Sequence, residues 1–531
     1  MTDSNEKVGP VFRLVEWGGF AVLLLTAILV PLFILPVNSF MRFDTDRAES
    51  LMAKLTLQQG LCAAALVLAA VSLAGPLWQR YRGAAALPAA LLAAFVAWGA
   101  LSCIASPIPA HSYYHWLIVG LPAAVALAGP MFFGDRRRVR ALVIALVAMA
   151  VVVALIGIFS ALGWRGFWIW AYGVDPREML TGAVSRKYEG GVTRSLSAST
   201  MGNAEYAGSL MAPMIAIAAV LLFDWAPGAR RPWVARGALL AVIGILMLEL
   251  ALTGSRQPWI ALALAGLLRL FLALRLPGWI MAVVFAGFLL GACFGGMLWG
   301  MAALAGLTLA ALGCAAWRGD AARALRQADR VNCALVVGGP LIALVFLAAF
   351  SVPGPWNPSG LRVYQRFESI AKSNDASVRE RLLMFVAASQ MIREDPLLGG
   401  GAGRYSNRFS ESIYEIVKTD ESGAVFLARN ELVGKIIDQC HNDYLQIATD
   451  MGLVALALFL SLLVAVLYHL ARIAATEQGE RRILALALIC CFAGFGVMML
   501  TSFPLQMPGR SSVFWVSMAG ALGLIAERPR V

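Results

Sequence analysis

Residues 440–470 read CHNDYLQIATDMGLVALALFLSLLVAVLYHL, a short polar start followed by a long apolar run. The run from 444 to 470 exceeds the roughly 20 apolar residues that a helix needs to cross a bilayer. It therefore predicts a transmembrane helix. His441, Asn442 and Tyr444 stand at the start of this helix, although the whole chain has only four histidines.

The composition extends this prediction to the whole chain. Of 531 residues, 60% are apolar and 14% are charged, and the mean hydropathy is +0.75. Such values exclude an ordinary soluble domain. Counting apolar stretches of about 18 residues or more predicts an all-α polytopic membrane protein with about fourteen transmembrane helices. The stretches lie near 18–37, 58–78, 84–105, 114–133, 141–163, 205–223, 237–253, 257–274, 278–296, 298–317, 332–351, 444–470, 483–503 and 511–526.

Basic residues in the short loops predict the orientation. If the N-terminus is cytoplasmic, most of the lysines and arginines in the short loops lie on the inner side of the membrane, for example Arg136, Arg137 and Arg138. This asymmetry follows the positive-inside rule and places both termini in the cytoplasm. It also explains the net charge of +12 without a nucleic-acid partner. The eight cysteines show neither a disulfide framework nor metal-ligand spacing, so no metal site is predicted.

The predicted organisation has three parts. Residues 1–351 form an N-terminal transmembrane bundle with an outer loop at 164–203 and a candidate inserted hairpin at 278–317. Residues 352–440 form one large outer loop, and residues 441–531 form the C-terminal transmembrane helices. Long loops commonly carry function.

One stretch of the large loop has clear helix signals. Ser377 and Glu380 have the spacing of a capping box. Apolar residues then follow a mostly helical pattern until Pro396 ends it. Arg379 and Arg381 consequently lie in the first turns, where a bound anion could offset their unfavourable interaction with the helix dipole.

A glycine cluster with Gly399, Gly401 and Gly403 follows this predicted helix. Its backbone N–H groups could converge on an anion. Alternatively, the chain could pass close to another segment there, or simply turn.

His441 has two interpretations, an interfacial residue beside Tyr444 or a catalytic group. Arg256 lies in a very short outer turn between two spans, and Arg194 precedes a helix on the same side. An arginine in such a turn requires water, a cavity or a counter-charge. An imidazole and several arginines at one membrane face suit a substrate with an anionic head and a lipid tail, such as a polyprenyl diphosphate.

These residues resemble the motifs of the O-antigen ligase/O-antigen polymerase superfamily. The motifs span about half of the chain, and the block around His441 is the most specific of them. The matching positions are His441, Asn442, Tyr444, Leu445, Asp450 and Gly452; Arg381, Phe385, Pro396, Gly399, Gly401, Gly403 and Tyr405; Ser255 and Arg256; and Arg194, Gly202 and Asn203.

The resemblance implies a multi-pass enzyme of the bacterial inner (cytoplasmic) membrane with its active site facing the periplasm, so that 352–440 is a periplasmic loop. The implied reaction is a metal-independent glycan transfer without a cofactor. The donor is a glycan linked to undecaprenyl diphosphate, and the acceptor is a hydroxyl of lipid A-core, another glycan or a protein.

The resemblance also implies roles for individual residues. His441 would be the general base. Arg381 and Arg256 would bind the diphosphate, with Arg194 and Arg379 as further donor-binding residues and Arg379 as an alternative to Arg381. The supporting residues would be Asn442, Tyr444, Asn203, Gly399, Gly401 and Gly403. Asp450 lies about 13 Å deeper along the helix than His441, so it is interpreted as structural.

Three functions remain open from the sequence: a ligase, a polymerase of the same superfamily, and a transporter of an anionic lipid or sugar. A transporter predicts internal repeats and charged or broken helices at mid-membrane. The sequence has no clear repeat, and the charges that could carry the mechanism gather outside the spans. An enzyme is therefore favoured.

Overall fold

The structure, a computed structural model, describes residues 9–33, 43–73, 76–81, 83–161, 201, 204–253, 255, 257–273, 376–419 and 437–527. A few side chains within its helices, including that of Arg379, are not part of this description. The predicted spans at 278–296, 298–317 and 332–351 lie outside the described residues. So does the predicted outer loop 164–203, apart from Met201.

Every regular element in these ranges is a helix, which confirms the all-α prediction for the described part of the chain. By length and composition, nine described helices are able to cross a membrane. They are α1 (Pro10–Leu32), α2 (Phe43–Leu73), α3 (Ala86–Ile104), α6 (Arg136–Ala161), α9 (Ala204–Val220), α10 (Pro232–Thr253), α20 (Asp443–Thr476), α21 (Glu480–Met499) and α22 (Pro508–Ala526).

Two further helices occupy predicted spans but are shorter than expected. α11 (Gln257–Ala273) covers the predicted span 257–274. The predicted span 114–133 is divided, because α4 (Pro109–Ala126) ends early and a single turn, α5 (Gly129–Phe132), follows. Gly129 and Pro130 favour this break, since proline restricts the residue before it and donates no backbone hydrogen bond.

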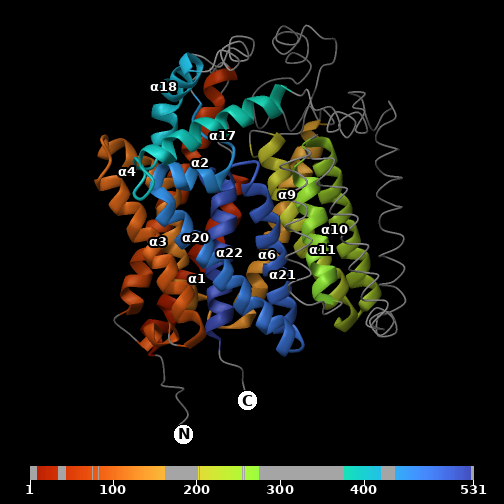
Figure 1. Cartoon of the computed structure of the whole chain (residues 1–531). Coiled ribbons are helices and arrows are strands. Elements are labelled where there is room, and N and C mark those ends of the chain that lie inside the picture. Colours follow the sequence, from red (N-terminus) through yellow and green to blue (C-terminus); the bar gives the residue numbers. More distant parts are fainter. Residues whose placement is uncertain are drawn as a thin grey trace, which may run out of the picture.

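The two ends of the bundle differ in chemistry. α1 begins and α22 ends at one end, whereas α17 (Ala376–Glu394) and α18 (Arg404–Thr419) lie across the other (Figure 1). Arginines predicted to be cytoplasmic meet acidic residues at the first end. Both Arg80 and Arg138 contact Glu16, at 2.8 and 2.7 Å, and Arg140 contacts Glu480 at 2.8 Å. The predicted inner segments that contain Arg80, Arg138 and Arg140 thus lie at the same end of the described bundle.

α17 and α18 are the described helices of the predicted large outer loop, 352–440. The capping signals predicted α17, whereas α18 was not predicted as a separate helix. Met384 and Met391 of α17 pack in one buried cluster with Tyr405, Phe409 and Ile413 of α18. The apolar pattern of α17 is divided between two faces, since Leu382 and Val386 are 57% and 48% exposed.

A kink in α20 anchors this helix pair to the bundle. Gly452 adopts φ 82° and ψ 170°, a conformation that favours glycine. The N–H of Leu453 donates to the carbonyl of Pro396 at 2.7 Å, and the N–H of Gly401 donates to the carbonyl of Asp450 at 2.8 Å. The loop that joins α17 to α18 therefore lies directly on the kink.

Gly452→Ala should destabilise the protein strongly. A Cβ at this position would lie 1.9 Å from the carbonyl oxygen of Leu397, and the backbone has positive φ. Both effects are costly, and we expect a loss above about 3 kcal/mol, measured by thermal unfolding in detergent. Gly244→Ala in α10 is the matched control, because nothing lies within 4 Å of its Cβ position. Equal melting temperatures for the two variants would contradict the importance of the kink.

Candidate functional site

His441 is held in an unusual backbone conformation immediately before α20. It is the one non-glycine residue with positive φ (56°) among those that the structure describes. Asn442 is the N-cap of α20: its Oδ1 accepts a hydrogen bond from the N–H of Leu445 at 3.0 Å, and its Nδ2 donates to the carbonyl of Leu500 at 3.1 Å. A cap of this kind stabilises the helix start, so Asn442 fixes the position of the histidine.

Further hydrogen bonds anchor the same segment on both sides of His441. The N–H of Cys440 donates to Oε1 of Gln446 at 2.9 Å, and the Tyr444 hydroxyl donates to the carbonyl of Gly496 at 3.0 Å. The buried Asp443 accepts from the N–H of Leu505 at 2.9 Å. The backbone on both sides of His441 is therefore held in place by hydrogen bonds.

Cys440 is excluded as a nucleophile. It is completely buried, and its thiol donates to the carbonyl of Asn442 at 3.0 Å. Burial raises the pKa of the thiol well above its ordinary value, and only the thiolate is nucleophilic.

The imidazole of His441 faces three elements distant in sequence. Its Nδ1 lies 3.9 Å from Oε1 of Glu205, at the start of α9. The other carboxylate oxygen of Glu205 lies 3.4 Å from Nη2 of Arg381 on α17. The ring of Phe503 packs edge-to-face against the imidazole, with 4.7 Å between centroids. The structure thus brings together the predicted base and one predicted diphosphate-binding arginine.

A second arginine near the cluster of His441, Glu205 and Arg381 is Arg510, at the start of α22. Arg510 is fully buried and donates to the hydroxyls of Ser209 at 2.7 Å and Ser502 at 3.2 Å. Its guanidinium stacks over the ring of Tyr206, 4.3 Å from the centroid. Because a charge in such a place is costly, a buried intramembrane arginine is a candidate for function.

Burial and these charges together set the protonation of His441. Burial lowers the pKa of its imidazole to about 4; Glu205 acts in the opposite direction, while Arg381 and Arg510 lower the pKa further. The imidazole is therefore neutral at pH 7 and has a lone pair available to accept a proton.

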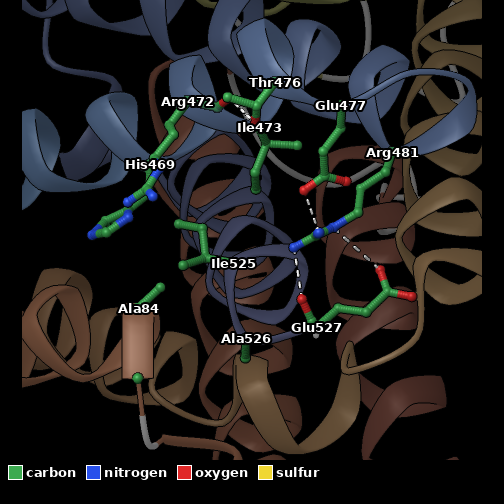
Figure 2. A pocket seen from close by; sticks show the side chains of 11 residues that line it. Ala84, His469, Arg472, Ile473, Thr476, Glu477, Arg481, Ile525, Ala526 and Glu527 are labelled. Carbon is green, nitrogen blue, oxygen red and sulfur yellow. Dashed lines mark hydrogen bonds and ion pairs between the residues drawn. The ribbon is translucent and has the colours of Figure 1, made fainter. Parts of the chain in front are cut away.

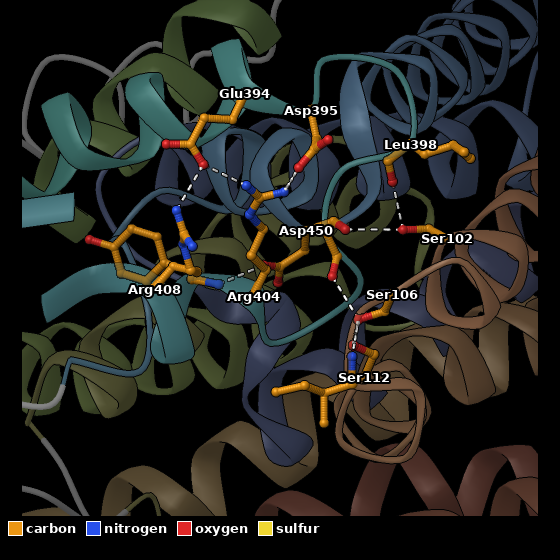
Figure 3. Close-up of polar contacts among 12 residues, drawn as sticks. Ser102, Ser106, Ser112, Glu394, Asp395, Leu398, Arg404, Arg408 and Asp450 are labelled. Carbon is orange, nitrogen blue, oxygen red and sulfur yellow. Dashed lines mark hydrogen bonds and ion pairs between the residues drawn. The ribbon is translucent and has the colours of Figure 1, made fainter. Parts of the chain in front are cut away.

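Asp450 is structural, as the sequence suggested. Its carboxylate accepts hydrogen bonds from the N–H groups of Gly403 and Tyr405, both at 3.1 Å, and from Nε2 of Gln446 at 2.9 Å. It therefore caps the start of α18. Its backbone carbonyl accepts from the hydroxyl of Ser102 at 3.1 Å (Figure 3).

The glycine loop that contains Gly399, Gly401 and Gly403 packs closely against the bundle and does not form an anion site. Gly399, Gly401 and Gly403 all have positive φ. Their N–H groups donate within the protein: to Asp395, to the carbonyl of Asp450 and to the carboxylate of Asp450, respectively. These N–H groups already have partners within the protein and are therefore not available to an anion. The hydrogen bonds to Asp450 hold the loop, and with it the end of α17, against α20.

Arg404, next to this loop, does not add a free cation to the site. It contacts Glu394 at 2.7 Å and also pairs with Asp395 (Figure 3). These ion pairs join the end of α17 to the start of α18. Arg381 is therefore the arginine of this region that lies against His441 in the described structure.

Asp450→Ala should loosen α18. Two backbone N–H groups lose their acceptor, and unsatisfied buried groups cost about 1–3 kcal/mol each. Asp450→Asn keeps one acceptor oxygen and should lie between Ala and the wild type. Hydrogen exchange of residues 403–419 measures the effect, with Glu411→Gln, an exposed carboxylate of α18, as the control. Unchanged exchange in Asp450→Ala would contradict the capping role.

The cavity in Figure 2 lies at the opposite end of α20. It has a volume of about 400 Å³ and is lined by residues including His469, Arg472, Arg481 and Glu527. Arg481 is bound there by Glu477 at 2.5 Å and by the carbonyl of Leu524 at 2.9 Å. Because α20 separates the cavity from His441, the cavity is not part of the candidate site.

Several predicted site residues lie outside the described residues: Arg194, Asn203 and Arg256. Arg379 lies in α17, but its side chain is not described. Their roles therefore stay predictions, as does the choice of Arg379 as an alternative to Arg381.

The sequence reasoning missed Glu205 and Arg510. A signal was present for both, since each is an ionisable residue at the start of an apolar helix. Glu205 lies two residues after Asn203, and Arg510 lies at the start of the apolar stretch 511–526.

Two comparisons with known proteins bear on the identity of the chain. A search of curated proteins found no match. The family described as O-Antigen ligase matches residues 239–460, a range that contains Arg381 and His441 and most of α10, α11, α17, α18 and α20. This match supports the similarity of residues 239–460 to the O-antigen ligase superfamily.

Proposed function

We propose that this protein transfers a glycan from an undecaprenyl diphosphate carrier to an acceptor hydroxyl at the periplasmic face of the inner membrane, as an O-antigen ligase. The main supporting observation is the cluster of His441, Glu205 and Arg381 at the end of the bundle that bears α17. That end is opposite the arginine-rich loops, which the positive-inside rule assigns to the cytoplasm.

His441 and Arg381 are suited to catalyse a single displacement at C1 of the transferred sugar. Nε2 of His441 takes the proton of the acceptor hydroxyl, and the hydroxyl oxygen forms a bond to C1 of the sugar. The bond between C1 and the phosphate oxygen breaks, and its electron pair leaves with the undecaprenyl diphosphate. Arg381 stabilises the charge that grows on this leaving group, because its forked N–H groups match phosphate oxygens.

The location of the cluster supports a lipid-linked donor. His441 directly precedes α20, and Glu205 begins a candidate membrane span, so both lie near the membrane boundary. Arg381 belongs to α17, outside the spans. A diphosphate at this height could contact Arg381 while its prenyl chain stays in the hydrocarbon.

A deletion strain complemented with the wild type, His441→Ala or Arg381→Ala tests this proposal. We expect surface glycan to be restored only by the wild type. Full-length carrier-linked chains that accumulate with the variants would identify a ligase, and single repeats would identify a polymerase. Restoration of normal surface glycan by both variants would contradict the proposal.

A further inference from the structure

Glu205 stands between the two side chains to which the proposed function assigns the chemistry. Oε2 lies 3.4 Å from Nη2 of Arg381, and Oε1 lies 3.9 Å from Nδ1 of His441. A separation of 3.9 Å is too long for a hydrogen bond. In this arrangement the carboxylate is closer to the arginine than to the histidine.

We propose that Glu205 couples donor binding to the base: a diphosphate that binds Arg381 replaces the carboxylate at the guanidinium, and the carboxylate then accepts a hydrogen bond from Nδ1 of His441. Glu205 is thus a positioning residue. This inference rests on the proposed function and extends it to the order of events, with the donor bound before the acceptor is activated.

The chemistry of the imidazole requires such a partner. For Nε2 to accept the acceptor proton, the neutral ring must carry its own proton on Nδ1, the nitrogen that faces Glu205. A carboxylate at Nδ1 selects this tautomer and stabilises the imidazolium that forms. The anchored segment around Asn442 leaves the carboxylate, rather than the histidine backbone, as the part that adjusts.

The electrostatics point in the same direction. Among the described residues, the charged groups that influence His441 are Glu205 from α9, Arg381 from α17 and Arg510 from α22. Burial and the two arginines keep the pKa of the imidazole near 4, so it is a weak base before the donor binds. The diphosphate adds negative charge beside Arg381, and a closer Glu205 adds more. Both changes raise the pKa of His441 and strengthen the base.

Titration of His441 tests the coupling without requiring glycan transfer. The purified full-length protein, with isotope-labelled histidines, is titrated by NMR with and without geranyl diphosphate. The signal of His441 is the one that His441→Asn lacks. A nearby opposite charge shifts a pKa by about 1–3 pH units, so we expect a rise of this size in the wild type and a much smaller rise in Glu205→Gln. Glu411→Gln, which loses an exposed carboxylate on α18, should behave as the wild type.

The outcomes separate the two proposals. If geranyl diphosphate binds through Arg381 but the pKa of His441 does not change, the coupling is overturned and the diphosphate site stands. If Glu205→Gln shows the full rise, the diphosphate charge acts alone and Glu205 has no coupling role. If Arg381→Ala binds geranyl diphosphate as tightly as the wild type does, the proposed donor site fails, and the coupling fails with it.

A second readout uses the reaction itself. At saturating donor, the pH profile of kcat/KM for the acceptor rises through the pKa of the base in the donor complex. In Glu205→Gln this limb should move to lower pH, with a lower plateau, because the base is weaker. Glu205→Asp should recover part of the plateau. A purely structural role of Glu205 would lower the rate without moving the limb.

Discussion

His441→Ala should lower the rate of glycan transfer by about 10²- to 10⁴-fold, the usual contribution of a general base. The expected effect is on kcat, since removal of the base leaves the diphosphate contacts of Arg381 in place. The measurement is the transfer rate of the purified protein with a lipid-linked glycan as donor.

The backbone of His441 calls for a second variant. Its φ of 56° disfavours alanine, so part of any loss in His441→Ala could come from the local fold. Asparagine tolerates this conformation and lacks a basic nitrogen, so His441→Asn should fold normally and still lose activity. His469→Ala, at the other end of α20, is the control and should retain activity. Full activity of His441→Asn would make the histidine an interfacial residue only.

Arg381→Ala should lower kcat by about 10²- to 10³-fold, the effect of removing one group that stabilises transition-state charge. The affinity for the diphosphate should fall as well. Arg381→Lys should recover only part of the rate, because an ammonium cannot reproduce the two parallel contacts of a guanidinium. The measurement is kcat and KM for the lipid-linked donor.

Arg393→Ala is the matched control for Arg381. It removes an exposed arginine from the same helix, α17, on the part distant from the start where Arg381 lies. We expect a transfer rate close to that of the wild type. Equal losses in the two variants would mean that the net charge of α17 matters rather than a contact at Arg381.

The sequence predicts most of the described bundle because apolar length is a local property. The runs at 444–470 and 483–503 correspond to α20 and α21, and the capping signals at Ser377 correspond to the start of α17. The kink at Gly452 was not predictable in the same way. It depends on the carbonyls of Pro396 and Leu397, which approach α20 from another part of the chain.

The candidate site was predictable only in part, for the same reason. The motifs identify His441 and Arg381 separately, but Glu205 becomes meaningful only where folding brings α9 between them. Arg510 is comparable, since its burial against Tyr206 and Ser209 requires α9 and α22 to pack together. Long-range packing of this kind leaves no local pattern.

The most direct measurement is the stoichiometry of one turnover. Purified wild-type protein is mixed with a glycan on undecaprenyl diphosphate and with the acceptor, and two products are counted. We expect one free undecaprenyl diphosphate for each glycosylated acceptor, and neither product at a comparable rate with His441→Asn. Release of the carrier without a glycosylated acceptor, or equal turnover by His441→Asn, would contradict a glycosyl transfer with His441 as its base.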